Sequence, residues 1–224
     1  MPRAFITGAT GQDGTYLTEL LHSQGYEVHG LVRGGDPDPL HPELIQLHRG
    51  DLTDRKHLAA LLHDLAPDEI YNLAGVSSVS VCWSDPVLAA EVNGAAAVFL
   101  MEEAWRVQEA TGERVAFIQA SSAEIFGQAA TSPQTESTPL APVNPYGASK
   151  ALAHLTAGVY RARGLHASSL ILYNHESPLR PPSFVTRKIT HGVAAIAKGE
   201  ATELRLGNLD ARRDWAGRPT TYGQ

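Results

Sequence analysis

The sequence predicts an α/β protein built on a doubly wound parallel sheet. Two observations lead to this prediction. Short apolar runs alternate with segments of helical periodicity, and a glycine-rich stretch, FITGATGQDG (residues 5–14), joins the first apolar run to the first helical segment. Such alternation is typical of parallel sheets with helices on both faces. Ligands of these sheets bind beyond the carboxyl ends of the strands, where the strand order reverses.

The first elements form a βαβ unit. A strand is expected at 3–7, a helix at 15–24 and a second strand at 27–32, and one face of the helix carries Tyr16, Leu17, Leu20 and Leu21. Further strands are expected at 45–48, 69–73, 115–120 and 167–173, with helices near 55–65, 86–110 and 146–163. The polar segments after the first, fourth, fifth and sixth strands should therefore meet at one crevice.

Composition limits the classes of partner. The net charge of −6 argues against nucleic-acid binding, and no segment approaches the roughly 20 apolar residues of a membrane helix. The single cysteine, Cys82, cannot form an internal disulfide and fits a reducing compartment. The ten histidines show no metal-ligand spacing, so no metal site is expected. We expect a soluble, cytoplasmic protein.

Gly8, Gly11 and Gly14 have the spacing Gly-x-x-Gly-x-x-Gly. A glycine triplet alone is a weak signal, because many are only turns. Here it follows an expected strand and opens an expected helix, the context in which a helix N-terminus binds a pyrophosphate. The spacing is also that of short-chain dehydrogenases and their extended relatives, so a dinucleotide-binding (Rossmann) domain is predicted.

The end of the second strand indicates which dinucleotide binds. An acidic residue about 20 residues beyond the glycines would accept a hydrogen bond from the ribose 2′-hydroxyl of NAD. This chain has Val32 and Arg33 there, and a guanidinium favours the 2′-phosphate of NADP. NADP is the predicted cofactor, and an ordinary solvated arginine is the alternative interpretation of Arg33. Asp51 and Leu52, after the third strand, are expected at the adenine.

The segment NPYGASK (144–150) places Tyr146 and Lys150 four residues apart on one helical face. A nearby ammonium favours the tyrosinate, which can take a hydroxyl proton at neutral pH, and Lys150 can also hold the nicotinamide ribose. This pair arises by chance in many helices. Here it follows a dinucleotide fingerprint and a strand that ends in Ala120, Ser121 and Ser122. Ser122 would complete the triad by a hydrogen bond to the substrate hydroxyl or carbonyl.

Glu124, in QASSAEIFG (119–127), distinguishes a dehydratase from a simple reductase or 4-epimerase. Once C4 of a hexose is oxidised to a ketone, the C5 proton becomes acidic. A base must remove that proton as water leaves from C6. The alternative interpretation is a glutamate on a surface loop.

Eight segments in order carry a family resemblance: ITGATGQDG, GDLTD, EIYNLAG, QASSAEIFG, NPYGASK, YNHESP, FVTRKI and LGNLDARRDW, which span 5–215. Together they resemble the GDP-mannose 4,6-dehydratases. The resemblance implies conversion of GDP-D-mannose to GDP-4-keto-6-deoxy-D-mannose by C4 oxidation with bound NADP, water elimination across C5–C6 and hydride return to C6. The alternatives are a nucleotide-sugar 4-epimerase or reductase of the same fold and a non-catalytic NADP-binding homologue.

The resemblance also assigns site residues. The catalytic positions are Ser122, where threonine is usual, with Glu124, Tyr146 and Lys150. The cofactor positions, which also include Tyr146 and Lys150, are Gly8, Thr10, Gly11, Gln12, Asp13, Gly14, Arg33, Asp51, Leu52, Leu73, Ala74, Ser77, His175 and Arg180. The substrate positions are Ser77, Ser122, Glu124, Asn174, Val185, Lys188, Asn208 and Arg213, in a basic stretch that suits a diphosphate.

Domain and assembly expectations follow from the same resemblance. Residues 1–173 should form the NADP-binding domain and 174–224 part of a nucleotide-sugar-binding region, because the family continues beyond this chain and we expect a truncated member. A homodimer through the helices near 86–110 and 146–163 is implied, with a homotetramer as the alternative. Two segments depart from the family pattern. Gly34–Pro39 replaces a second arginine and a serine-rich loop, and Leu179 and Pro181 replace arginine and glycine.

Overall fold

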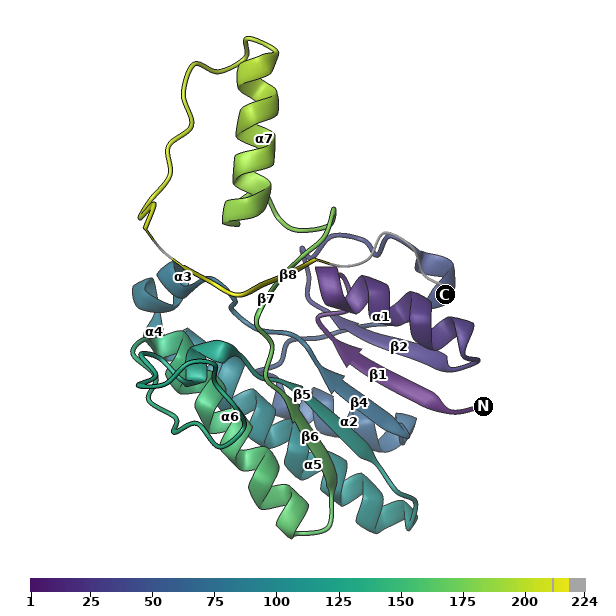
Figure 1. Ribbon diagram of the computed structural model, residues 1–224. Coiled ribbons are helices and arrows are strands. Elements are labelled where there is room, and N and C mark those ends of the chain that lie inside the picture. The colour runs from purple at the N-terminus through teal and green to yellow at the C-terminus, as the bar shows by residue number, and fades with distance from the viewer. Residues whose placement is uncertain (211, 218–224) are drawn as a thin grey trace. The chain divides into compact units, whose positions relative to one another are not determined.

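The computed structural model describes residues 1–210 and 212–217 (Figure 1). The chain separates into two compact units, Met1–Leu172 and a second unit that begins at Tyr173. Each unit has its own sheet. Within the described ranges, none of the helices combines the length and the apolar character that crossing a lipid bilayer requires.

The first unit contains a six-stranded parallel sheet in the order β3-β2-β1-β4-β5-β6. Its strands are β1 (Arg3–Thr7), β2 (Glu27–Val32), β3 (Gln46–Arg49), β4 (Glu69–Asn72), β5 (Ala116–Ala120) and β6 (His166–Leu170). The order reverses between β1 and β4, which opens a crevice beyond their carboxyl ends. The predicted doubly wound parallel sheet is confirmed.

The helices of this unit are α1 (Gln12–Ser23), α2 (Arg55–Leu65), α3 (Val79–Ser84), α4 (Pro86–Ala89), α5 (Ala96–Thr111) and α6 (Pro145–Ala162). The predicted helix near 86–110 is helical without a gap from Pro86 to Thr111, but a π-helical segment, Ala90–Ala95, lies between α4 and α5. The short helix α3 was not predicted. A 3₁₀ turn at Ala123–Ile125 follows β5.

Apolar side chains fill both faces of the sheet, as expected for strands covered on two sides. Phe5, Ile70 and Phe117 pack with α2, α5 and α6, whereas Ala4 and Ile6 face the opposite cluster with α1. The predicted apolar face of α1 is partly wrong. Its buried residues are Gly14, Thr15, Thr18 and Leu21, while Leu20 is exposed. Small residues on this face let the helix lie close to the strands.

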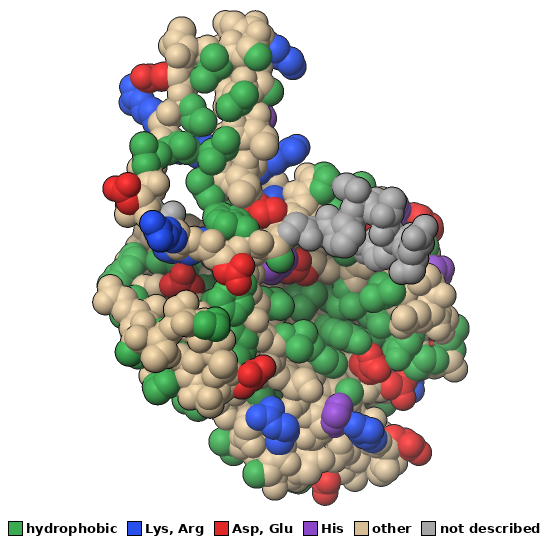
Figure 2. Space-filling model, in the orientation of Figure 1, with side chains coloured by type: hydrophobic (Ala, Val, Ile, Leu, Met, Phe, Trp, Pro, Cys, Tyr) green, Lys and Arg blue, Asp and Glu red, His purple; other side chains and the backbone are tan. Residues whose placement is uncertain are grey.

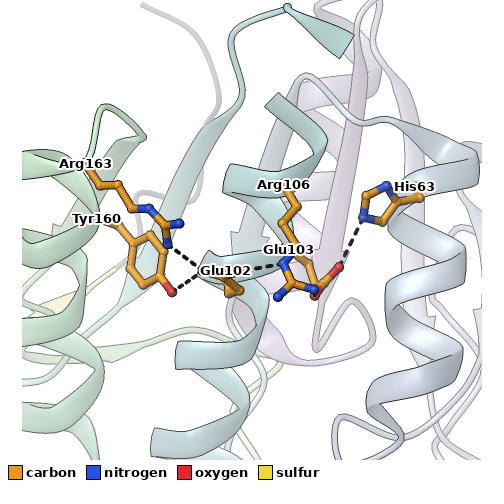
Figure 3. A network of polar contacts seen from close by, with 6 residues as sticks. All are labelled: His63, Glu102, Glu103, Arg106, Tyr160 and Arg163. Atoms are coloured by element: carbon orange, nitrogen blue, oxygen red, sulfur yellow. Dashed lines mark hydrogen bonds and ion pairs between the residues drawn. The ribbon is translucent and has the colours of Figure 1, made fainter. Parts of the chain in front are cut away.

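A polar network joins α5 to α2 and α6 (Figure 3). Glu102 on α5 accepts hydrogen bonds from the Tyr160 hydroxyl and from Arg163 Nη1, each at 2.8 Å. Its neighbour Glu103 is buried and lies 3.2 Å from Nε2 of His63 on α2. These two adjacent carboxylates tie three helices together on one side of the sheet.

The second unit is small. It has a two-stranded parallel sheet of β7 (Asn174–Glu176) and β8 (Trp215–Gly217), and the helix α7 (Val185–Ala197), none of whose residues is buried. None of these three elements was predicted from the sequence.

Charge is mixed on the visible surface of the described chain. Figure 2 shows acidic and basic side chains interspersed on that face of each unit, with no continuous basic area. This distribution agrees with the acidic composition and does not offer a track for a nucleic-acid backbone on that face.

Candidate active site

The glycine-rich loop connects β1 to α1 at the carboxyl edge of the sheet. Gly8 has a φ of +73°, and a Cβ there would lie 2.9 Å from the backbone nitrogen of Ala74. A Cβ at Gly14 would collide with the carbonyl oxygen of Gly8. Gly11 is the N-cap of α1 and has no side chain. The first backbone N–H groups of the helix therefore receive no side-chain hydrogen bond from the N-cap residue. The loop therefore has the form of a pyrophosphate cradle.

Two further loop residues accompany the glycines. Thr10 is half-buried, and Gln12 Nε2 donates to Asp13 Oδ1 at 3.2 Å within the first turn of α1.

The loop after β4 is tied to the glycine-rich loop. The Thr7 hydroxyl donates to Asn72 Oδ1 at 2.7 Å and accepts from the Ala74 backbone N–H at 3.1 Å. Leu73 and Ala74 are half-buried, and Ser77 is exposed. This loop therefore lies directly beside the cradle, as the predicted switch point requires.

A buried asparagine in the π-helical segment positions the same loop. Asn93 Oδ1 accepts from the Val76 N–H at 2.8 Å, and its Nδ2 donates to the Val76 carbonyl at 3.1 Å. A Cβ at Gly75 would lie 2.7 Å from Asn93 Oδ1 and 3.5 Å from Lys150 Nζ. The loop thus reaches from the glycine cradle to Lys150. Sequence reasoning missed Asn93, and the signal was a polar residue inside an apolar helical pattern.

Lys150 is a buried cation at the centre of this region. Its side chain is 4% exposed, and Nζ donates to the Ala120 carbonyl at 3.0 Å. Burial lowers the pKa of Lys150 to about 8, so the ammonium still predominates at pH 7. Nζ lies 5.9 Å from the centre of the half-buried Tyr146 ring. The predicted lysine and tyrosine therefore face one another on α6.

The turn after β5 is held against the N-terminus of α6. Ser122 Oγ accepts from the Glu124 N–H at 3.2 Å, and Glu124 Oε2 accepts from Asn144 Nδ2 at 2.8 Å. Asn144 Oδ1 in turn caps α6 by accepting from the Gly147 N–H at 2.7 Å. A Cβ at Gly147 would collide with the Glu124 carbonyl oxygen. The structure thus brings Ser122 and Glu124 to the start of the helix that carries Tyr146 and Lys150.

Two residues of this turn and cap were missed by sequence reasoning. Asn144 orients the Glu124 carboxylate, a role that its position as a helix cap did not reveal. Ser121 is buried, and its Oγ has no hydrogen-bond partner among the described residues.

A pocket of about 700 Å³ lies at the carboxyl ends of β2 and β3. It is lined by Arg33, Gly34, Gly35, Asp36, Arg49, Gly50 and Asp51. Hydrogen bonds from Thr53 lower the pKa of Asp51, which keeps that carboxylate charged. The side chain of Leu52 packs in the main core, so its backbone is the part that can face a ligand. Arg33 and Asp51 therefore line one cavity at the edge where an adenosine would bind.

The other candidate residues belong to the second unit. His175 Nδ1 lies 2.7 Å from the Tyr173 carbonyl oxygen, and the Arg180 guanidinium stacks 3.7 Å from the centre of the Phe184 ring. Asn208 Oδ1 accepts from the Asp210 N–H, and Arg213 donates to the Arg212 carbonyl. Asn174 lies on β7, and Val185 and Lys188 lie on α7.

Comparison with known proteins gives consistent matches. A family model described as GDP-mannose 4,6 dehydratase matches residues 5–219. GDP-mannose 4,6-dehydratase sdnI of Sordaria araneosa is 47% identical over 220 residues, which cover 95% of this chain and 40% of that protein. GDP-mannose 4,6 dehydratase 1 of Arabidopsis thaliana is 44% identical over 226 residues, covering 95% and 62%. The chain therefore spans less than two thirds of these relatives.

A solved structure supports the fold independently. The dTDP-glucose 4,6-dehydratase of Bacillus anthracis str. Ames, in complex with NAD, aligns with a TM-score of 0.76 at 20% identity. The alignment covers 97% of this chain and 68% of that one.

Proposed function

The chain belongs to the GDP-mannose 4,6-dehydratase family, and from this premise we propose that it converts GDP-D-mannose to GDP-4-keto-6-deoxy-D-mannose. The observation that carries the proposal is the hydrogen-bonded position of Glu124, beside Ser122 and against the N-terminus of the helix with Tyr146 and Lys150. A carboxylate here suits a dehydration.

We propose NADP as the cofactor. The glycine cradle at Gly8 and Gly14 fits a pyrophosphate, and Arg33 lines the pocket where a 2′-phosphate would lie. When bound, the nicotinamide supplies the hydride acceptor at C4 and the hydride donor at C6. The dTDP-glucose 4,6-dehydratase of Bacillus anthracis, which has a similar fold, is in complex with NAD. The proposal of NADP rather than NAD for this chain therefore depends on Arg33.

Tyr146 is proposed to take the proton of the C4 hydroxyl. The buried Lys150 ammonium lies on the same side of α6 and favours the tyrosinate, because a nearby positive charge stabilises the anion. Ser122 would hold the C4 oxygen by a hydrogen bond as that oxygen changes from hydroxyl to carbonyl. These three groups perform proton transfer and orientation at C4.

Glu124 is proposed to act at C5 and C6. Its carboxylate takes the C5 proton, the electrons of the C5–H bond form the C5–C6 double bond, and the C6–O bond breaks. Glu124 returns a proton to the oxygen, which leaves as water. The proton that Tyr146 took from the C4 hydroxyl would then go to C5 when the hydride returns to C6. The Asn144 amide holds the carboxylate at 2.8 Å and so keeps it aimed during both transfers.

The test is incubation of the chain with NADP and GDP-mannose, followed by mass spectrometry. We expect a 4-keto-6-deoxy product that is lighter by one water. Glu124→Gln should lose this product but keep NADP binding, and Glu136→Gln, an exposed glutamate in the next loop, should act as wild type. An unaltered rate in Glu124→Gln would remove that residue from the mechanism. A product that keeps the C6 hydroxyl would favour the epimerase or reductase. NADP binding without any product would favour the non-catalytic homologue.

We also propose that the protein is cytoplasmic, which is consistent with its one free cysteine. We further propose that it forms a homodimer. Helices α3, α4 and α6 expose large apolar side chains, among them Trp83, Val87, Leu155 and Val159. Leu155 and Val159 are four residues apart on α6, so they share one helical face. A second copy of the chain is the proposed cover. Sedimentation experiments should find a dimer, or a tetramer, for the wild type. The same experiments should find a monomer for Leu155→Glu.

A further inference from the structure

The pocket at the ends of β2 and β3 contains charges of both signs. Arg33 and Arg49 contribute guanidinium groups from neighbouring strand ends, and Asp36 and Asp51 contribute carboxylates. Thr53 donates two hydrogen bonds to the Asp51 carboxylate, at 2.8 Å from its backbone N–H and 2.6 Å from its hydroxyl. The other three charged residues of the lining are Arg33, Asp36 and Arg49.

Asp36 is bound to the arginine that was predicted to hold a 2′-phosphate. Its Oδ2 accepts from the Arg33 backbone N–H at 2.8 Å, and its Oδ1 accepts from Arg33 Nη2 at 3.1 Å. The Arg33 side chain is 65% exposed and can turn, whereas the Asp36 side chain is 24% exposed. The bond to the backbone keeps the carboxylate at the strand end even when the guanidinium moves. A carboxylate therefore stands where sequence reasoning found no acidic residue.

Arg49 supplies a second positive charge to the same pocket. It ends β3, the strand beside β2, and its side chain is exposed. Gly34, which follows Arg33, has no charge to contribute. A phosphate between the two strand ends can therefore be approached by one guanidinium from each strand.

We propose that Arg49 and Asp36 determine the preference between NADP and NAD and that they act in opposite directions, Arg49 in favour of NADP and Asp36 against it. Arg49 attracts the 2′-phosphate from the β3 side. Asp36 competes with that phosphate for the Arg33 guanidinium and repels its negative charge. The proposal rests on the dinucleotide site of the proposed function, and it assigns the discrimination to three side chains rather than to Arg33 alone.

The experiment measures Kd values of NADP and NAD for the full chain by isothermal titration calorimetry. Asp36→Asn keeps an acceptor for the Arg33 N–H but removes the charge, and should increase the preference for NADP on the order of tenfold. Arg49→Ala should decrease NADP affinity on the order of tenfold and leave NAD affinity nearly unchanged. Because both dinucleotides use the same cradle, the NAD affinity of each variant reports whether the pocket is still folded.

Matched controls separate this effect from net charge. Asp38→Asn removes an exposed carboxylate from the same loop, and Arg114→Ala removes an exposed guanidinium just before the amino end of β5, three strands away from β2 in the sheet. Neither should change the NADP-to-NAD ratio by more than about twofold, because separated surface charges are screened by salt.

The outcomes distinguish the two levels of the argument. If both dinucleotides bind but Asp36→Asn and Arg49→Ala leave the ratio of the wild type, or the controls shift it equally, the inference is overturned and the proposed cofactor site stands. If the wild type binds neither dinucleotide, the proposed function fails and the inference fails with it.

Discussion

Replacing Lys150 by methionine is expected to stabilise the fold while it removes a proposed catalytic group. Burial lowers the pKa of Lys150 from 10.5 to about 8, which corresponds to a cost of about 3 kcal/mol for keeping the ammonium inside the folded protein at pH 7. The lost hydrogen bond to the Ala120 carbonyl offsets about 1 kcal/mol of the gain. Methionine has a similar volume and fills the space. The free energy of unfolding should therefore rise by about 2 kcal/mol.

Urea denaturation followed by circular dichroism measures this change. Between pH 8 and 10.5 the unfolded wild type binds more protons at residue 150 than the folded protein does. The free energy of unfolding of the wild type therefore rises with pH over this range. The difference between Lys150→Met and the wild type should accordingly shrink over that range. Lys56→Met, at an exposed position of α2, should change stability by less than about 0.5 kcal/mol. A less stable Lys150→Met at pH 7 would refute the assigned cost of burial.

Three other perturbations test the fold around the site. Burial lowers the pKa of His29 and of His48, so these residues bind protons at a higher pH in the unfolded chain than in the folded protein. The free energy of unfolding should therefore fall as the pH drops from about 6.5 toward 5. In urea denaturation at several pH values, His48→Gln should make this fall less steep. Gly147→Ala adds a methyl that meets a backbone carbonyl and should cost about 1–3 kcal/mol in thermal unfolding. Glu102→Gln should cost about 1 kcal/mol by the same measurement, whereas Glu109→Gln, exposed on the same helix, should be neutral.

The sheet was predictable because its strands are short apolar runs between turn signals. The predicted bounds of β1 and β2 agree with the structure to the residue. The helix at 86–110 was predicted without its π-helical segment, because apolar periodicity does not show that Asn93 turns its amide to the loop after β4. Likewise the pattern of α1 suggested Leu20 as buried, while the close approach at Gly14 selects small residues.

The candidate site was predictable where its chemistry depends on local spacing. Tyr146 and Lys150 are neighbours on one helix, so their separation along the chain already places them together. Asn144 and Asp36 act through contacts that spacing does not encode: the first reaches Glu124 across 20 positions, and the second folds back onto Arg33. The first is a tertiary contact and the second belongs to a local turn, and neither was visible before the structure.

Isotope tracing tests the central claim most directly. GDP-mannose that carries deuterium at C4 should give, with the wild-type chain and NADP, a 4-keto-6-deoxy product that carries the deuterium at C6. That result requires oxidation at C4, loss of the C6 hydroxyl and return of the same hydride within one active site. A product with deuterium restored at C4 and the C6 hydroxyl intact would contradict the dehydratase mechanism.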